Sequence, residues 1–219
     1  MIDAFSCRLR HRAGWRVDLG CLAAAIVGLV LLTSCGGAAA LTGTDLGGQP
    51  APNFTLTDQR GDAVSLADFR GKAVVLTFIH THCPDVCPAT AEHLRETYAQ
   101  LPPGTRDRVA FLAVTVDPAR DTPAALRAFA AQHGLDDNPA WFALTGDRTT
   151  LAAVWRDYGI DPGAMMMSPS SMPMPTPAGG TLAHTDAVYL IDPAGHERTL
   201  LHSDLHSARL AADLQTLTR

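Results

Sequence analysis

Two runs of consecutive apolar residues constrain the fold of this chain more than any other feature of its sequence. Residues 73–79 (AVVLTFI) and 109–116 (VAFLAVTV) are rich in β-branched and aromatic side chains and lack a regular polar alternation. A strand with this pattern is covered on both faces, as in the centre of a parallel sheet. The two runs therefore predict an α/β fold with helices on both sides of a sheet.

Helical patterns alternate with these strands. A helix is predicted from Pro88, where apolar residues recur at spacings of three and four, until Pro-Pro-Gly at 102–104 ends it. Thr122 and Pro123 predict the N-cap and first turn of a second helix. Further along, the patterns predict a short strand at 141–144 and a helix at 147–158. The order indicates βαβ units.

Hairpins are predicted at both ends of this arrangement. Residues 54–57 and 63–66 flank a turn that contains Gly61, and residues 187–191 and 199–201 flank Asp-Pro-Ala-Gly. A last helix is predicted at about 204–217. Together the elements predict a thioredoxin-like fold, a mixed central sheet flanked by helices, with an N-terminal hairpin.

The first 34 residues read as a signal peptide of the lipoprotein type. Four arginines precede an apolar run at 19–32, which is shorter than the roughly 20 residues that span a bilayer. The sequence Leu-Thr-Ser-Cys at 32–35 resembles the bacterial lipobox, in which the cysteine carries the lipid, so Cys35 is the expected lipidation site. An uncleaved anchor and an ordinary cleavage site are the alternatives. In each case the domain is exported, and we expect it on the extracytoplasmic face of a bacterial cell membrane.

Export leaves one pair of cysteines in the mature domain. Residues 35–50 are rich in Gly, Ala and Thr and predict a flexible tether, with the domain at 51–219. Of the five cysteines, Cys7 and Cys21 are lost with the signal and Cys35 carries lipid. Only Cys83 and Cys87 then face the oxidising compartment.

These two cysteines follow a predicted strand and open a predicted helix, in the sequence HTHCPDVCP at 80–88. Amides at a helix N-terminus favour thiolate over thiol. A separation of four residues places Cys83 and Cys87 on the same helical face. The pair can therefore close a disulfide or hold one metal ion.

A third ligand is expected from His184, which enters the strand of the last hairpin. Two thiolates and an imidazole suit copper, as Cu(I) or Cu(II), whereas structural zinc usually takes a fourth protein ligand and calcium takes oxygens. His82 is expected to pack or hydrogen-bond beside the cysteines and not to bind the metal. Asp117 and Asp121 are expected to cap the following helix and satisfy the loop backbone.

Three separated motifs resemble the Sco/SenC copper chaperones of cytochrome c oxidase assembly: F-x-x-THCPDVCP at 78–88, VDP-x-RDTP at 116–123 and H-x-x-x-x-YLIDP at 184–193. The resemblance covers about residues 50–219. It implies that Cys83, Cys87 and His184 hold copper. It also implies that the protein serves the dinuclear copper centre of cytochrome c oxidase subunit II as metal donor, thiol reductant or both, a chaperone more than an enzyme.

Two features depart from the family pattern. His80 stands where members commonly have an aromatic or similar residue, so it either adds an extra imidazole near the thiolates or is a harmless substitution. A segment rich in Pro and Ser holds every methionine except Met1, and we interpret it either as an accessory copper-capture loop or as an exposed insertion; these methionines are Met165, Met166, Met167, Met172 and Met174.

Other functions compete with copper delivery. A thiol-disulfide oxidoreductase would use Cys83 to attack and Cys87 to resolve. A peroxidase, or a copper or redox sensor or buffer, would use the same pair. The net charge of −5 and the absence of a basic run beyond the extreme N-terminus argue against nucleic acid as a partner.

Overall fold

Three parallel strands form the centre of the fold. The structure, a computed structural model, describes residues 40–165, 187–202 and 205–219. Strand β4 (Ala73–Ile79) pairs in parallel with β5 (Val109–Thr115), and β5 pairs in parallel with β6 (Trp141–Thr145). Every residue of β4 and β5 is buried. The expectation that these runs are covered on both faces is confirmed.

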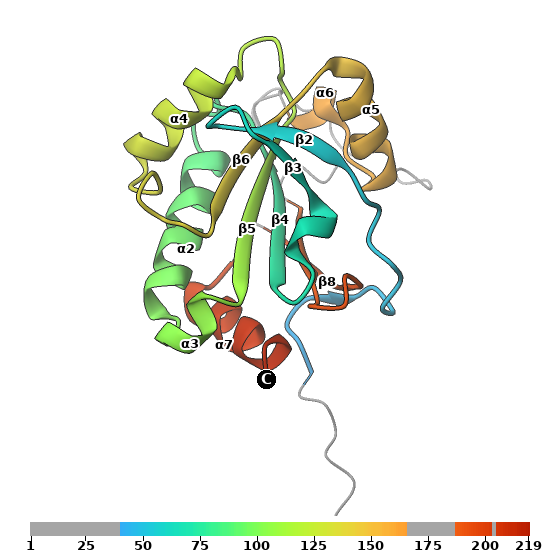
Figure 1. Cartoon of the computed structure of the whole chain (residues 1–219), viewed down its shortest axis with the longest axis vertical. Helices are drawn as coiled ribbons and strands as arrows, with labels where there is room; N and C mark the ends of the chain where they lie inside the picture. Colours follow the sequence, from blue (N-terminus) through green and yellow to red (C-terminus); the bar gives the residue numbers. More distant parts are fainter. Residues whose placement is uncertain (1–39, 166–186, 203–204) are drawn as a thin grey trace, which may run out of the picture. The chain divides into compact units, whose positions relative to one another are not determined.

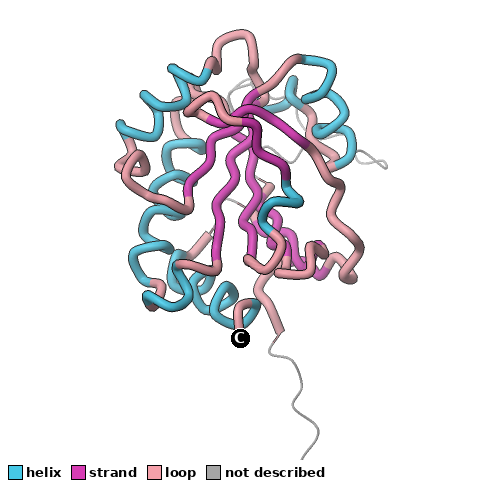
Figure 2. The backbone as a smooth tube through the Cα atoms, viewed as in Figure 1, coloured by secondary structure: helices cyan, strands magenta, loops and turns pink. Residues whose placement is uncertain are grey.

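Antiparallel strands extend the sheet on both sides of this centre (Figure 2). Strand β7 (Val188–Ile191) lies beside β4 and is followed outward by β8 (Glu197–Leu201) and β1 (Thr44–Asp45). On the other side, β6 pairs with β2 (Thr55–Asp58) of the hairpin that β3 (Ala63–Ser65) completes. The predicted mixed sheet, N-terminal hairpin and late hairpin are therefore present.

Helices cover the two faces of the sheet (Figure 1). Helices α2 (Val86–Gln100), α4 (Pro123–Gln132) and α7 (Ser207–Leu217) contribute buried residues to the core on one face. Helix α5 (Arg148–Asp157), the short 3-10 helix η1 (Leu66–Phe69) and the first hairpin contribute to the core on the other face. Two single-turn helices, α3 (Pro103–Arg106) and α6 (Pro162–Met165), complete the described elements.

The starts of three helices follow from side chains that accept hydrogen bonds from free amides. Thr122 caps α4, as the sequence predicts, and Asp147, which the sequence places at the start of a helix, is the N-cap of α5. Helix α2 begins at Val86, two positions before the predicted start at Pro88, because Asp85 accepts from the Val86 amide and serves as N-cap. A proline is tolerated in the first turn, where its missing amide has no helical partner.

The ordered domain begins earlier than predicted. Strand β1 pairs with β8, and the Thr199 hydroxyl donates to the carbonyls of Thr42 and Thr44, at 2.7 and 3.0 Å. The Leu46 amide also donates to the Arg198 carbonyl at 3.1 Å. The prediction of a flexible tether up to residue 50 is therefore wrong for these residues, since backbone pairing to an open sheet edge needs no apolar side chains.

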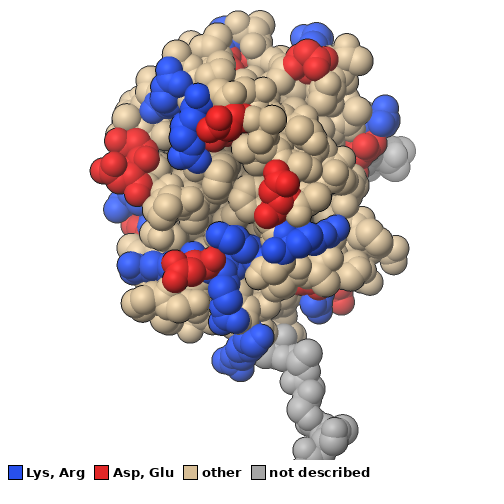
Figure 3. Space-filling view, viewed as in Figure 1, with Lys and Arg blue, Asp and Glu red and all other residues tan. Residues whose placement is uncertain are grey.

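Charged side chains of both signs are interspersed with uncharged surface on the face drawn in Figure 3. Within the three described stretches, no helix is long and apolar enough to cross a membrane.

Candidate metal centre

A tight turn at the end of β4 leads into α2 and brings the two cysteines together. The Cys83 amide donates to the His80 carbonyl at 3.2 Å, and α2 begins three residues after Cys83. The Cys87 amide, in the first turn of α2, points at the Cys83 sulfur, with N and Sγ 3.3 Å apart. Cys83 is half-buried and Cys87 is buried, and both are free thiols. The predicted pairing of these side chains at the strand-to-helix junction is present.

His80 lies with the two cysteines. One imidazole nitrogen of His80 and the sulfurs of Cys83 and Cys87 all lie within 4.8 Å of one another. His80 is only 6% exposed, and its Nδ1 atom has no hydrogen-bond partner. A buried nitrogen normally has a partner, so this atom is available to a ligand. The donor set, two sulfurs and a nitrogen, fits a soft metal ion.

The two thiols differ in acidity. The hydrogen bond with Cys87 and the backbone amides of Cys87 and Asp85 lower the pKa of Cys83 to about 5, although burial opposes this shift. The same hydrogen bond, together with burial, raises the pKa of Cys87 far above that of an ordinary thiol. At neutral pH the junction therefore presents one accessible thiolate beside one buried thiol.

Asp121 holds the loop that carries the site. It is fully buried and accepts hydrogen bonds from the Thr81 amide at 3.1 Å, the Thr81 hydroxyl at 2.6 Å and the Thr115 hydroxyl at 2.5 Å. The expectation that this aspartate satisfies the loop backbone is confirmed. The expectation that it caps the next helix is wrong, because Thr122 occupies that position. Asp121 instead joins the ends of β4 and β5.

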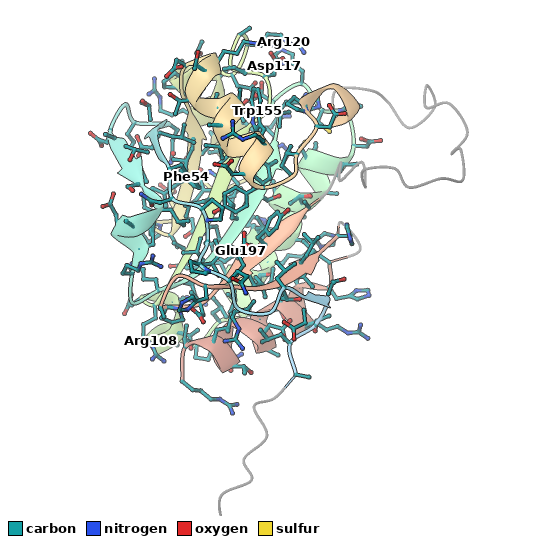
Figure 4. All side chains as sticks on the ribbon, turned by 90° about the vertical axis from the view of Figure 1, so that its right-hand side faces the viewer. Phe54, Arg108, Asp117, Arg120, Trp155 and Glu197 are labelled. Carbon is teal, nitrogen blue, oxygen red and sulfur yellow. The ribbon has the colours of Figure 1, made fainter. Side chains whose placement is uncertain are left out.

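Asp117 takes part in the structure of the same loop. Its carboxylate pairs with Arg120, and its amide donates to the Thr115 hydroxyl at 2.9 Å. Figure 4 shows Asp117 and Arg120 close together on the loop after β5, near Trp155 of α5. The Trp155 indole donates to the Thr115 carbonyl at 3.0 Å, so this helix braces the same strand end. The role of Asp117 is thus to shape the loop.

Several predicted site residues lie outside the described residues. These are Cys35, His184, Met166, Met167, Met172 and Met174, while Met165 ends α6 with its side chain undescribed. The described part of the chain brings Cys83 and Cys87 together and adds His80, for which the sequence left two interpretations open. The signal that could have favoured a metal-facing role is its position three residues before Cys83, directly after a buried strand.

Comparison with known proteins assigns the family. The SCO1/SenC family model matches residues 43–219. The chain is 36% identical over 163 residues to the mitochondrial SCO2 homolog of Bos taurus, a match that covers 74% of this chain and 55% of that protein. This chain spans about half the length of the mammalian mitochondrial relatives that it matches.

Solved structures agree with the fold. The structure of ScoI from Bradyrhizobium japonicum with copper bound is 31% identical, with a TM-score of 0.56, and the match covers 77% of this chain and 99% of that one. The apo Sco1 protein of Thermus thermophilus is 29% identical, with a TM-score of 0.63, over 83% of this chain and 99% of that one. The predicted thioredoxin-like fold is confirmed by these neighbours. The three motifs occur in the family's order along the sequence, the fold matches solved Sco structures, and the family model covers most of the chain. This chain therefore belongs to the SCO1/SenC family.

Proposed function

We propose that this protein is a membrane-anchored, extracytoplasmic copper chaperone that delivers copper to the dinuclear copper site of cytochrome c oxidase subunit II. The observation that carries the proposal is the convergence of Cys83, Cys87 and a buried imidazole within 4.8 Å, in a chain of the SCO1/SenC family. Soft thiolates with imidazole select copper over hard cations. The copper-bound ScoI relative supports the same metal.

His184 is the proposed ligand from the last hairpin. Strand β7 runs antiparallel to β4, and the Thr77 hydroxyl donates to the Ala187 carbonyl at 3.2 Å, close to the end of β4 that carries the site. His184 precedes Ala187 by three residues, a reach of at most about 11 Å of extended chain. This distance supports its approach to the two sulfurs.

The thiol chemistry couples metal binding to redox state. A cysteine binds copper as its thiolate, so the binding of a metal ion to a buried thiol releases its proton. Cys83 is already a thiolate at neutral pH because its pKa is about 5, so it takes the metal first. Cys87, whose pKa is raised by Cys83 and burial, then gives up its proton as the metal enters. When an external disulfide takes two electrons from the pair by thiol-disulfide exchange, Cys83 and Cys87 form a disulfide that no longer binds copper.

Delivery to oxidase has a direct test. Copper-loaded chain is mixed with the apo copper-binding domain of subunit II, the two are separated, and copper is measured in each. We expect transfer from wild-type chain and none from the Cys83→Ser variant.

In cells, deletion of the gene should lower oxidase activity, and added copper should restore it. Unchanged oxidase activity with an altered response to copper favours a sensor or buffer.

The difference between the two thiols also favours a second function, thiol-disulfide exchange. An accessible thiolate at Cys83 is the attacking group, and Cys87 resolves the mixed disulfide. This activity does not need an imidazole ligand. A His184→Ala variant that still reduces a subunit II disulfide at the wild-type rate, but no longer retains copper, separates the two activities.

The anchor and the methionine segment are testable parts of the same proposal. We place lipid on Cys35, so Cys35→Ser should release the protein from the membrane fraction.

The thioethers of Met165, Met166, Met167, Met172 and Met174 are proposed to capture Cu(I) for the site. Deletion of residues 165–174 should lower Cu(I) stoichiometry or loading rate; unchanged binding and transfer would remove this role.

A further inference from the structure

Two buried side-chain nitrogens lack a hydrogen-bond partner within the described residues, and they differ in what they can bind. These atoms are Nδ1 of His80 and Nε1 of Trp141. The indole nitrogen of tryptophan only donates a proton and cannot ligate a metal ion. An imidazole nitrogen has a lone pair and is a common metal ligand. Of the two unsatisfied atoms, therefore, only the one in His80 is open to a metal.

The position of His80 matches this chemistry. One of its imidazole nitrogens lies within 4.8 Å of both cysteine sulfurs. Nitrogen and thiolate ligands stand about 2.0–2.3 Å from a first-row ion, so three ligands in a plane are about 3.7 Å apart. A contraction of about 1 Å, within reach of small side-chain rotations, converts the present arrangement into a three-coordinate site.

A purely packing role for His80 does not explain the unpartnered nitrogen. A phenyl ring would fill the same buried space without a polar atom. An imidazole used only as filler leaves Nδ1 desolvated with no hydrogen bond, which is unfavourable. A metal ion bound at Nδ1 would relieve that desolvation.

We propose that His80 is a copper ligand, so that Cys83, Cys87 and His80 form a three-coordinate site at the end of β4 that holds copper without His184. This inference rests on the proposed copper binding and adds a ligand to it. All three residues lie on one strand-turn-helix unit that Asp121 ties to β5. His184, on a separate segment, can then leave the metal to an acceptor while three ligands still retain it.

Competition with a chromophoric Cu(I) chelator measures the contribution of His80. The reduced full chain is titrated without oxygen as wild type, His80→Phe, and His82→Gln as the matched control, since His82 is exposed and bonds to the Thr81 hydroxyl. Loss of an outer-shell partner costs about 10–100-fold in metal affinity, so loss of a ligand should cost at least tenfold. We expect that loss for His80→Phe and no change for His82→Gln. Wild-type affinity in His80→Phe would overturn the inference while leaving copper binding intact.

A second measurement leaves His80 untouched, so it does not depend on how His80→Phe folds. Copper X-ray absorption of the loaded His82→Gln/His184→Ala variant should still show imidazole scattering from His80, at about one ring per copper. Copper surrounded by sulfur alone would overturn the inference. A wild-type chain that binds no copper would overturn both this inference and the proposed function, which separates the two kinds of failure.

Discussion

Two junctions in this molecule bring distant segments together around buried polar groups. They differ in whether those groups have hydrogen-bond partners. At the seam between residues 42–46 and β8, the Thr199 hydroxyl reaches two carbonyls and the Thr42 amide donates to Asp213 at 3.2 Å. At the end of β4, Nδ1 of His80 has no partner and two thiols are free. The polar groups at the first junction are satisfied internally, whereas those at the metal centre are left open to a ligand.

The second junction nevertheless rests on a satisfied framework. Asp121, directly behind the turn, accepts three hydrogen bonds from Thr81 and Thr115. The nitrogen and sulfur atoms available to a metal thus lie on a loop that these hydrogen bonds hold in place, as in a preorganised site. The following substitutions test whether the first junction contributes only to stability and the second also to copper binding.

Replacement of either cysteine by serine should have the largest effect. A hydroxyl is a far poorer ligand for copper than a thiolate, so Cys83→Ser and Cys87→Ser should each lower Cu(I) affinity by more than about 100-fold. Chelator competition on the reduced chain measures this. Retention of copper by both variants would place the metal elsewhere.

The two thiols should differ in alkylation by roughly 100-fold at pH 7. The pKa of Cys83 is lowered to about 5, so its thiolate dominates above that pH, whereas the raised pKa of Cys87 keeps it a thiol. The rate at Cys83 should rise through about pH 5 and then stay flat. Mass spectrometry after timed iodoacetamide pulses follows each site. A rate at Cys83 that keeps climbing beyond pH 8, as for an ordinary thiol, would contradict the assignment.

Asp121→Asn should destabilise the domain by about 2–3 kcal/mol, because hydrogen bonds to a charged acceptor are lost and an amide NH₂ faces donor hydroxyls. Chemical denaturation measures the free energy of unfolding. Asp117→Asn is the matched control and should cost less, since its carboxylate pairs with the half-exposed Arg120. Equal costs for the two variants would show that Asp121 has no special part in the framework.

Thr199→Val should have the smallest effect, a loss of about 1 kcal/mol in the free energy of unfolding. The change keeps the shape of the side chain and removes the hydroxyl that reaches Thr42 and Thr44. Copper affinity should not change. A weaker copper site in this variant would show that the two junctions are coupled.

Local signals predicted most of the fold. Strands β4 and β5, the cap Thr122 and the N-terminal hairpin follow from patterns within a few residues. The start of α2 was misplaced because Pro88 is a stronger sequence marker than Asp85. The seam at β1 was missed because it depends on backbone pairing across the fold, with Thr44 opposite Leu200.

The site was predicted in part for a similar reason. Cys83 and Cys87 are close in sequence, so their pairing could be inferred from spacing. The support from Asp121 joins residues 40 positions apart, and no single-sequence pattern specifies that contact. Whether His80 turns toward the sulfurs depends on the path of the turn after Ile79, which is a property of the folded loop.

The central claim is that the reduced cysteine pair at the end of β4 is a copper site. Its most direct test is the copper content and absorption spectrum of the purified chain, with both thiols reduced, loaded with copper and then desalted. The account predicts one strongly held copper ion at the cysteine pair and, after loading with Cu(II), a thiolate-to-copper charge-transfer band that is absent from Cys83→Ser. A fully reduced wild-type chain that keeps no copper through desalting would contradict it.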